Sequence, residues 1–220
     1  MIVHKFTAVS ILAAGFLVVA AAQITKTAPA TYVLRAKYQK GQVIKFMTVS
    51  GIDSKSNALA GTTLKIPITL RVLDVKKGVA TVRLTMSAVV LDGQVVQPEQ
   101  SATFPLDNRN RGESGSQSIG AHLPIKPIKV GGTWKSVMPV NIGGTTAALE
   151  GVYRFAGVQT VNGHLVGVIT YSLSGPATGT GTLMMLASDG TMYSNETRLA
   201  VTGGGGNRAL TRIHSTMTRN

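Results

Sequence analysis

The amino-acid sequence predicts an all-β protein: a single curved antiparallel sheet or a partly open β-barrel of long, hairpin-linked strands. Apolar and polar side chains alternate over long stretches, which is the period of a strand with one buried face. Dipeptides that favour tight hairpins separate these stretches, namely Asp92-Gly93, Asn162-Gly163 and Asp189-Gly190. Helical periodicity is nearly absent after residue 30. Long antiparallel strands twist, so we expect about eight to ten of them to form one curved sheet.

The composition agrees with one folded domain. The chain has 220 residues, of which 44% are hydrophobic and 14% are charged, and this is too apolar for a disordered chain. It has 22 Lys and Arg against 9 Asp and Glu, a formal net charge of +13, and no cysteine. The lack of cysteine excludes disulfides, iron–sulfur clusters, cysteine-bound zinc, a thiol nucleophile and a lipoprotein anchor.

Residues 1–22 predict a secretory signal peptide. Lys5 precedes an uncharged run from Phe6 to Ala22, and this run ends in three alanines that fit a cleavage site. We therefore expect cleavage between Ala22 and Gln23, and an exported protein that is periplasmic, secreted or associated with the cell envelope. An uncleaved anchor is the alternative, because the run has 17 residues, and about 17 is the lower limit for a membrane-spanning helix.

The β domain is expected at residues 31–220, after a short exposed lead-in at 23–30. Its first half contains two alternating strands of about twelve residues, longer than the usual five or six. Their apolar faces are Leu64, Ile66, Ile68, Leu70 and Val72, and then Val82, Leu84, Met86, Ala88 and Val90. Further turns are expected at Gln39-Lys40-Gly41 and Lys76-Lys77-Gly78.

The second half of the chain predicts two hairpins and a last strand. The expected strands are 152–161 with 164–173, 181–188 with 191–201, and 208–218. Leu183 to Leu186 is apolar at every position, so this run is either covered on both sides or lines a cavity. Residues 106–121 are polar and rich in Gly and Ser, and we expect a mobile loop there.

Two segments carry a family resemblance. The run from Pro127 to Trp134 (Pro-Ile-Lys-Val-Gly-Gly-Thr-Trp) and the run from Tyr153 to Tyr171 resemble exported bacterial β-proteins of a domain-of-unknown-function family. Loosely, and in architecture alone, the chain is similar to periplasmic lipoprotein-carrier and lipid-binding half-barrels. The resemblance implies a signal peptide followed by one curved sheet, and it brings no catalytic residues. Members of that family are often lipoproteins, and this chain departs from them because it has no cysteine.

The sequence contains no catalytic, metal or cofactor motif. His122, His164 and His214 have no ligand partner at the spacing of a local metal site. No Gly-x-Ser-x-Gly is present, the carboxylates are scattered singly, and the glycine-rich runs lack the Lys-Ser/Thr of a phosphate loop. We therefore expect no cofactor and no enzymatic activity. A hydrolase assembled from distant residues stays a third hypothesis, and it requires a histidine beside a carboxylate in a cleft.

The leading hypothesis is an exported protein that binds an apolar or amphiphilic ligand, such as a lipid, or a partner on a concave β face. Burial of apolar ligand surface would drive binding, and basic residues at the rim would meet an anionic head group. The candidate binding residues are Trp134, Tyr171, Met184, Leu186, Lys126 and Lys129. For Trp134 and the methionines, simple core packing is the competing interpretation.

The excess of basic residues supports a second hypothesis. A structural or adhesive module could hold an anionic polysaccharide or a partner protein through a basic face, and such a face would also attract an anionic membrane surface. Nucleic acid is disfavoured because export separates the protein from the genome, and because the basic residues lack interleaved aromatic side chains. High net charge also serves solubility alone. The sequence leaves the oligomeric state open.

Overall fold

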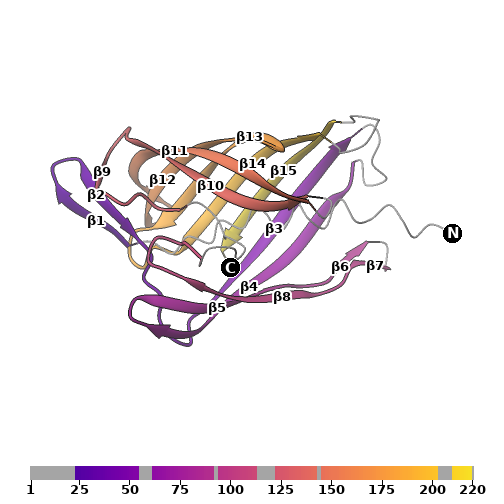
Figure 1. Cartoon of the computed structure of the whole chain (residues 1–220), viewed down its shortest axis with the longest axis horizontal. Helices are drawn as coiled ribbons and strands as arrows, with labels where there is room; N and C mark the ends of the chain where they lie inside the picture. Colours follow the sequence, from indigo (N-terminus) through magenta and orange to yellow (C-terminus); the bar gives the residue numbers. More distant parts are fainter. Residues whose placement is uncertain are drawn as a thin grey trace.

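The computed structural model describes residues 23–54, 61–91, 94–112, 122–142, 145–202 and 210–219, and Figure 1 shows their arrangement. In these ranges the chain is all-β without helix, and its ten-stranded antiparallel sheet is curved and not closed into a barrel. The predicted fold class is confirmed. The predicted signal peptide at 1–22, the predicted Asp92-Gly93 turn and most of the expected loop at 106–121 lie outside the described residues. No helix in the described part of the chain is long and apolar enough to cross a membrane.

The large sheet consists of two meanders. The first meander contains β3 (Val43–Ser54), β4 (Thr63–Lys76), β5 (Val79–Met86) and β8 (Gln100–Leu106). The second contains β10 (Thr133–Ile142), β11 (Thr145–Val161), β12 (His164–Ser174), β13 (Ala177–Leu186), β14 (Met192–Thr202) and β15 (Leu210–Arg219). The last strand, β15, pairs with β3 and joins the two meanders. The sheet therefore has β10 at one edge and β8 at the other.

Two smaller sheets accompany it. β1 (Gln23–Ala28), β2 (Thr31–Arg35) and β9 (Ile128–Lys129) form a three-stranded sheet, which stands at the left end of the molecule in Figure 1. β6 (Val89–Leu91) and β7 (Gln94–Gln97) form a short hairpin. The expected lead-in at 23–30 is largely exposed, but most of it forms strand β1.

The alternation in β4 buries the side chains that the sequence predicts. Leu64, Ile66, Ile68, Leu70 and Val72 are each 6% exposed or less. They lie on the inner face of the sheet, as we call its buried side, and the residues between them lie on the outer face. Period-two alternation of aliphatic residues is thus enough to orient this strand.

The expected strand at 82–90 is interrupted, which corrects the prediction. Val90, which we expected on the buried face, is 58% exposed, whereas Val89 is 2% exposed. The cause lies on the neighbouring strand, where Pro67 accepts a hydrogen bond of 3.0 Å from the N–H of Ser87. Proline has no N–H to return a second bond, so the ladder between β4 and β5 ends and the alternation shifts by one residue.

The predicted hairpins are found where the chain is described. Asn162-Gly163 joins β11 to β12 with φ of 49° and 79°, the left-handed pair that a type I′ turn requires. Lys77-Gly78 joins β4 to β5 with the same φ values. Asp189-Gly190 belongs to a longer loop, because the N–H of Leu186 donates to Thr191 O across it.

Candidate functional site

One row of the inner face crosses eight strands of the large sheet. Its members are direct cross-strand neighbours and run in the order Trp134, Tyr153, Tyr171, Gly181, Thr197, Ser215, Ser50 and Leu64. Trp134 stacks on Tyr153 with ring centroids 5.5 Å apart, and Tyr153 lies 5.7 Å from Tyr171. The row therefore changes from aromatic rings at the β10 edge to hydroxyl groups in the middle of the sheet.

Glycines make room for the two tyrosine rings. A Cβ on Gly151 would lie 2.5 Å from the ring of Tyr153, and a Cβ on Gly181 would lie 2.3 Å from the ring of Tyr171. Because Gly181 has no side chain, the Tyr171 hydroxyl reaches β14. There it donates to Asn195 Oδ1 over 2.9 Å and shares a hydrogen bond of 2.5 Å with Thr197 Oγ1. Burial raises the pKa of Tyr171 above its ordinary value although these two hydrogen bonds oppose the shift, so the phenol stays protonated.

A pocket of about 430 Å³ lies beside Trp134, where the chain passes from β8 to β10. Its apolar lining includes Leu123 and Ile128, which are buried, and Ile125, which is 67% exposed. The indole N–H of Trp134 donates to His122 O over 2.8 Å, so the ring is fixed against this wall. The pocket has a size that suits a small amphiphile.

The wall of the pocket is held from β2. The guanidinium of Arg35 donates to Pro124 O over 2.9 Å and to Ile125 O over 2.7 Å. From the other side, Arg109 Nε donates to Leu123 O, and the N–H of Leu123 donates to Arg109 O. These bonds order residues 122–125 without a regular strand, so the pocket is preformed.

The polar lining of the pocket is cationic. Arg109, Lys126 and Lys135 line it, and no carboxylate of the described residues does. Asp107 is near, but its carboxylate pairs with Arg111 over 2.6 Å. Among the described residues, none of the three lining cations forms a salt bridge. Burial lowers the pKa of His122; the charge of Asp107 opposes this shift, and the charges of Arg111 and Arg109 reinforce it, so the imidazole is neutral at pH 7.

The structure brings some of the predicted binding residues together and separates others. Trp134 and Tyr171 share the inner face and are connected through Tyr153, and Lys126 lines the pocket at Trp134. Lys129 lies exposed on β9, next to the pocket but outside its lining. Met184 and Leu186 alternate with the buried Leu183 and Met185 and therefore lie on the outer face, away from Trp134.

Several residues of the site were not singled out from the sequence. Lys135 follows Trp134 in β10, and because neighbours in a strand point to opposite faces, the sequence gives no reason to place both at one pocket. Arg35 and Arg109 act through backbone carbonyls about 90 and 14 positions away, and no local pattern marks such contacts. Tyr153 falls in the quoted motif, but its role depends on its place in the cross-strand row.

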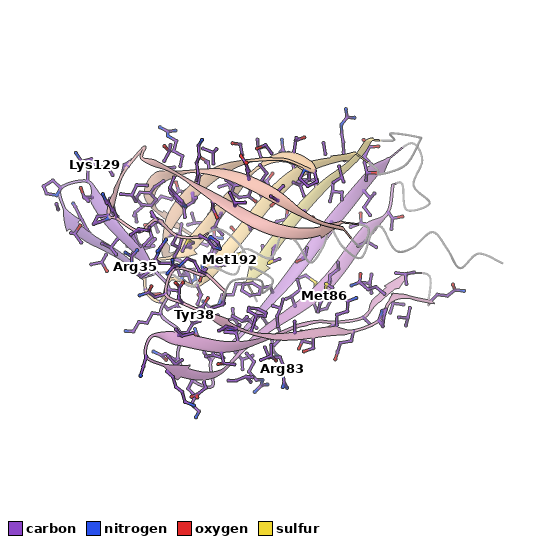
Figure 2. The ribbon with its side chains drawn as sticks, viewed as in Figure 1. Arg35, Tyr38, Arg83, Met86, Lys129 and Met192 are labelled. Atoms are coloured by element: carbon purple, nitrogen blue, oxygen red, sulfur yellow. The ribbon has the colours of Figure 1, made fainter. Side chains whose placement is uncertain are left out.

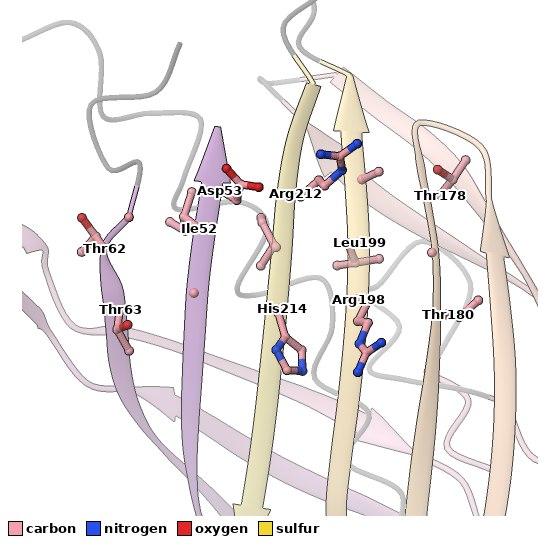
Figure 3. Close-up of a pocket in the computed structure, with 15 residues that line it drawn as sticks. Ile52, Asp53, Thr62, Thr63, Thr178, Thr180, Arg198, Leu199, Arg212 and His214 are labelled. Atoms are coloured by element: carbon pink, nitrogen blue, oxygen red, sulfur yellow. The ribbon is translucent and has the colours of Figure 1, made fainter. Parts of the chain in front are cut away.

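A larger groove of about 630 Å³ crosses β3, β15 and β14, and Figure 3 shows Arg198, Arg212 and His214 there. His214 Nε2 lies 3.2 Å from Glu196 Oε1, which also pairs with Arg198 over 3.2 Å. This is the histidine–carboxylate pair that the hydrolase hypothesis requires. However, the imidazole side chain is 55% exposed, and no serine or threonine hydroxyl of the described residues is hydrogen-bonded to it, so a positioned nucleophile is missing.

Metal ligands do not gather in the described part of the chain, where no group of three or more His, Asp or Glu comes together. Comparison with models of known protein families finds no match, and comparison with curated proteins finds no significant relative. The pocket beside Trp134 joins an aromatic ring to three cations that form no ion pair with any described residue.

Proposed function

We propose that this protein is an exported, non-enzymatic binding protein that takes an amphiphile with an anionic head group in the pocket beside Trp134. One observation carries the proposal: apolar side chains and cations line the same pocket of about 430 Å³, and none of its described lining residues is a carboxylate. An apolar tail would lie against Trp134 and the isoleucines, and its burial would supply most of the binding free energy. The head group would meet Lys126, Lys135 and Arg109.

The balance of charges supports an anionic head group over a neutral one. A cation without an ion pair loses little when an anion approaches, because no existing bond has to break. The neutral His122 in the same wall adds no competing charge at pH 7. A zwitterionic head group would bring its own cation to this rim and would gain less.

Trp134 makes the proposal directly testable, because it is the single tryptophan of the chain. Its fluorescence would be followed while monomeric lysophosphatidylglycerol is added, and again with lysophosphatidylcholine of the same acyl chain. We expect a saturable change with both lipids and about five-fold weaker binding of the choline lipid, since one charge pair at a protein surface is worth about 1 kcal/mol.

Two variants test whether the preference for the anionic head group arises at the cations that line the pocket. Lys135→Gln should weaken lysophosphatidylglycerol binding about five-fold and leave the choline lipid nearly unchanged. The matched control is Lys65→Gln, an exposed lysine on the outer face of β4, which should bind like the unchanged protein. Equal affinity for the two lipids, or equal effects of the two variants, would overturn the assignment of the head group to this rim.

A further inference from the structure

The positive charge of the protein is concentrated at one end. Residues 23–38, 107–112 and 122–135, which we call the basic end, contain eight Lys and Arg and one Asp in 36 residues. The other 135 described residues contain eleven Lys and Arg and six Asp and Glu. Hydrogen bonds connect the three segments, from Ala36 N to Asn108 O and from Leu123 N to Arg109 O. Arg35 and Lys129 are labelled toward this end in Figure 2.

An exposed strip of alternating character forms part of this end. It runs Ile125-Lys126-Pro127-Ile128-Lys129-Val130, and of these six residues Ile128 alone is buried. Ile125 is 67% exposed and Val130 is 47% exposed. Ile128 anchors the strip, because it pairs with Tyr32 of β2 and packs in the core. Two large aliphatic side chains, Ile125 and Val130, are thus exposed at the two ends of the strip, each next to an exposed lysine.

The strip is poorly suited to pairing with another strand. β9 is the edge of the small sheet and pairs with β2 alone among the described strands. However, it is only two residues long, and Pro127 beside it has no N–H to donate. A partner that adds a β-strand would therefore find few backbone groups, and the exposed side chains must account for any binding.

We propose that the basic end docks on an anionic lipid bilayer, with Val130 and Ile125 in the head-group layer and Lys129 and Lys126 at the phosphates. Such a surface offers negative charge above an apolar layer, which matches lysines interleaved with aliphatic side chains. A polysaccharide would neutralise the lysines but offer no apolar layer for the valine and isoleucine. The strip also lines the pocket at Trp134, so a docked protein would hold that pocket at the membrane surface. The docking itself does not depend on a ligand in the pocket.

The test is flotation of the purified full chain with vesicles of phosphatidylcholine, with and without about a third of phosphatidylglycerol. The intact mass of each variant establishes its N-terminus. Because all variants carry the same N-terminus, its contribution to vesicle binding does not affect the comparison between them. We expect binding to the anionic vesicles that falls steeply with salt. Lys129→Glu should lower the partition about 25-fold, at about five-fold for each unit of charge near the surface, and Val130→Asn should lower it several-fold.

The matched control is Lys65→Glu, an equal change of charge at an exposed position on the outer face of β4, for which we expect less than a two-fold effect. An equal loss with Lys65→Glu would mean attraction by net charge alone and would overturn the docking site. Equal binding to both kinds of vesicle would also overturn it. Sedimentation of the protein without vesicles gives a further check: if Val130→Asn binds vesicles less well only because it no longer self-associates, the docking site is overturned as well.

The lysolipid titration separates this proposal from the pocket. Neither Lys129 nor Val130 lines the pocket, so both variants should keep the Trp134 fluorescence response while they lose vesicle binding. Lost vesicle binding with an intact titration supports docking by the strip. A normal titration together with unchanged vesicle binding in both variants refutes docking and leaves ligand binding standing.

Discussion

The two meanders build their shared inner face from different chemistry. The first uses aliphatic side chains such as Ile68, Leu70 and Val82, each 1% exposed or less. The second also buries aliphatic side chains, such as Leu183 and Met185. It adds tyrosine rings seated over glycines and hydroxyl groups, as in the row through Tyr171, Gly181 and Thr197. An aliphatic face tolerates exchange of shape and is damaged by loss of volume. A face of rings seated over glycines is damaged by added volume and by lost hydrogen bonds, so the two meanders should respond oppositely to mutation.

The largest effect is expected from lost volume in the first meander. Leu70→Ala removes a fully buried side chain and should lower the free energy of unfolding by about 2–5 kcal/mol, because the surrounding strands cannot close the cavity. Leu70→Met, which keeps the volume, should cost less than about 1.5 kcal/mol. Urea denaturation measures both. Similar losses for the two variants would show that shape and not volume controls this meander.

The next effect comes from added volume in the second meander. Gly181→Ala places a Cβ 2.3 Å from the ring of Tyr171 and 2.5 Å from Glu196 O, and should cost about 1–3 kcal/mol of stability. Gly51→Ala in β3 is the matched control, since a Cβ there has nothing within 4 Å. It should be neutral or stabilise slightly, because alanine restricts the unfolded chain more than glycine does. Equal losses of stability for Gly181→Ala and Gly51→Ala would contradict this expectation.

Hydrogen bonding in the second meander should give a smaller loss. Tyr171→Phe leaves Asn195 Oδ1 and Thr197 Oγ1 without the phenol, which should cost about 1–2 kcal/mol. Tyr153→Phe removes a hydroxyl that has no hydrogen bond to any described residue and should be nearly neutral. Thermal unfolding of the two variants measures the difference, and a larger loss for Tyr153→Phe would contradict the assignment of roles.

Two hairpin carboxylates should differ in their effect on acid stability, which is the smallest contrast. Burial alone would raise the pKa of Asp189, but hydrogen bonds from Thr191 and the charge of Arg219 hold it below its ordinary value. A lowered pKa in the folded state means that Asp189 stabilises the fold above about pH 4 and that this stability disappears as the pH falls through the folded pKa. Asp189→Asn should therefore destabilise the protein at pH 6, and this loss of stability should diminish as the pH falls through the folded pKa.

Asp74 in the first meander is the carboxylate with which the pH-dependent effect of Asp189 on stability is compared. Its pKa is also lowered, mainly by a hydrogen bond from Lys76, but the side chains of Lys76 and Lys40 that pair with it are largely exposed. Water and salt screen such pairs. Asp74→Asn should thus change the stability little between pH 6 and pH 3. Added salt should remove any remaining difference in stability between this variant and the unchanged protein. Equal pH profiles for the two asparagine variants would refute the contrast.

Sequence reasoning succeeds for the first meander because β4 has aliphatic residues at period two and polar residues between them. It fails at Val90, because Pro67 on another strand ends the ladder there. In the second meander, Asn162-Gly163 predicts the hairpin between β11 and β12. The run from Leu183 to Leu186 is apolar at every position, so the sequence does not show which of its side chains face the core. Trp134 and Tyr171 could be proposed as partners in one site, whereas Arg35 could not, because its contacts with Pro124 and Ile125 exist only in the folded chain.

The pairing of β15 with β3 has a consequence for how the protein reaches its fold. Each meander consists of neighbours in sequence and can assemble from local hairpins, but the seam between them joins residues 46–54 to residues 211–219. Closing so long a loop is entropically costly and slow compared with hairpin formation. During synthesis from the N-terminus, one edge of β3 therefore stays open until β15 has been made. During that interval the exposed edge is the point at which a chaperone would protect the chain or a second chain would pair with it.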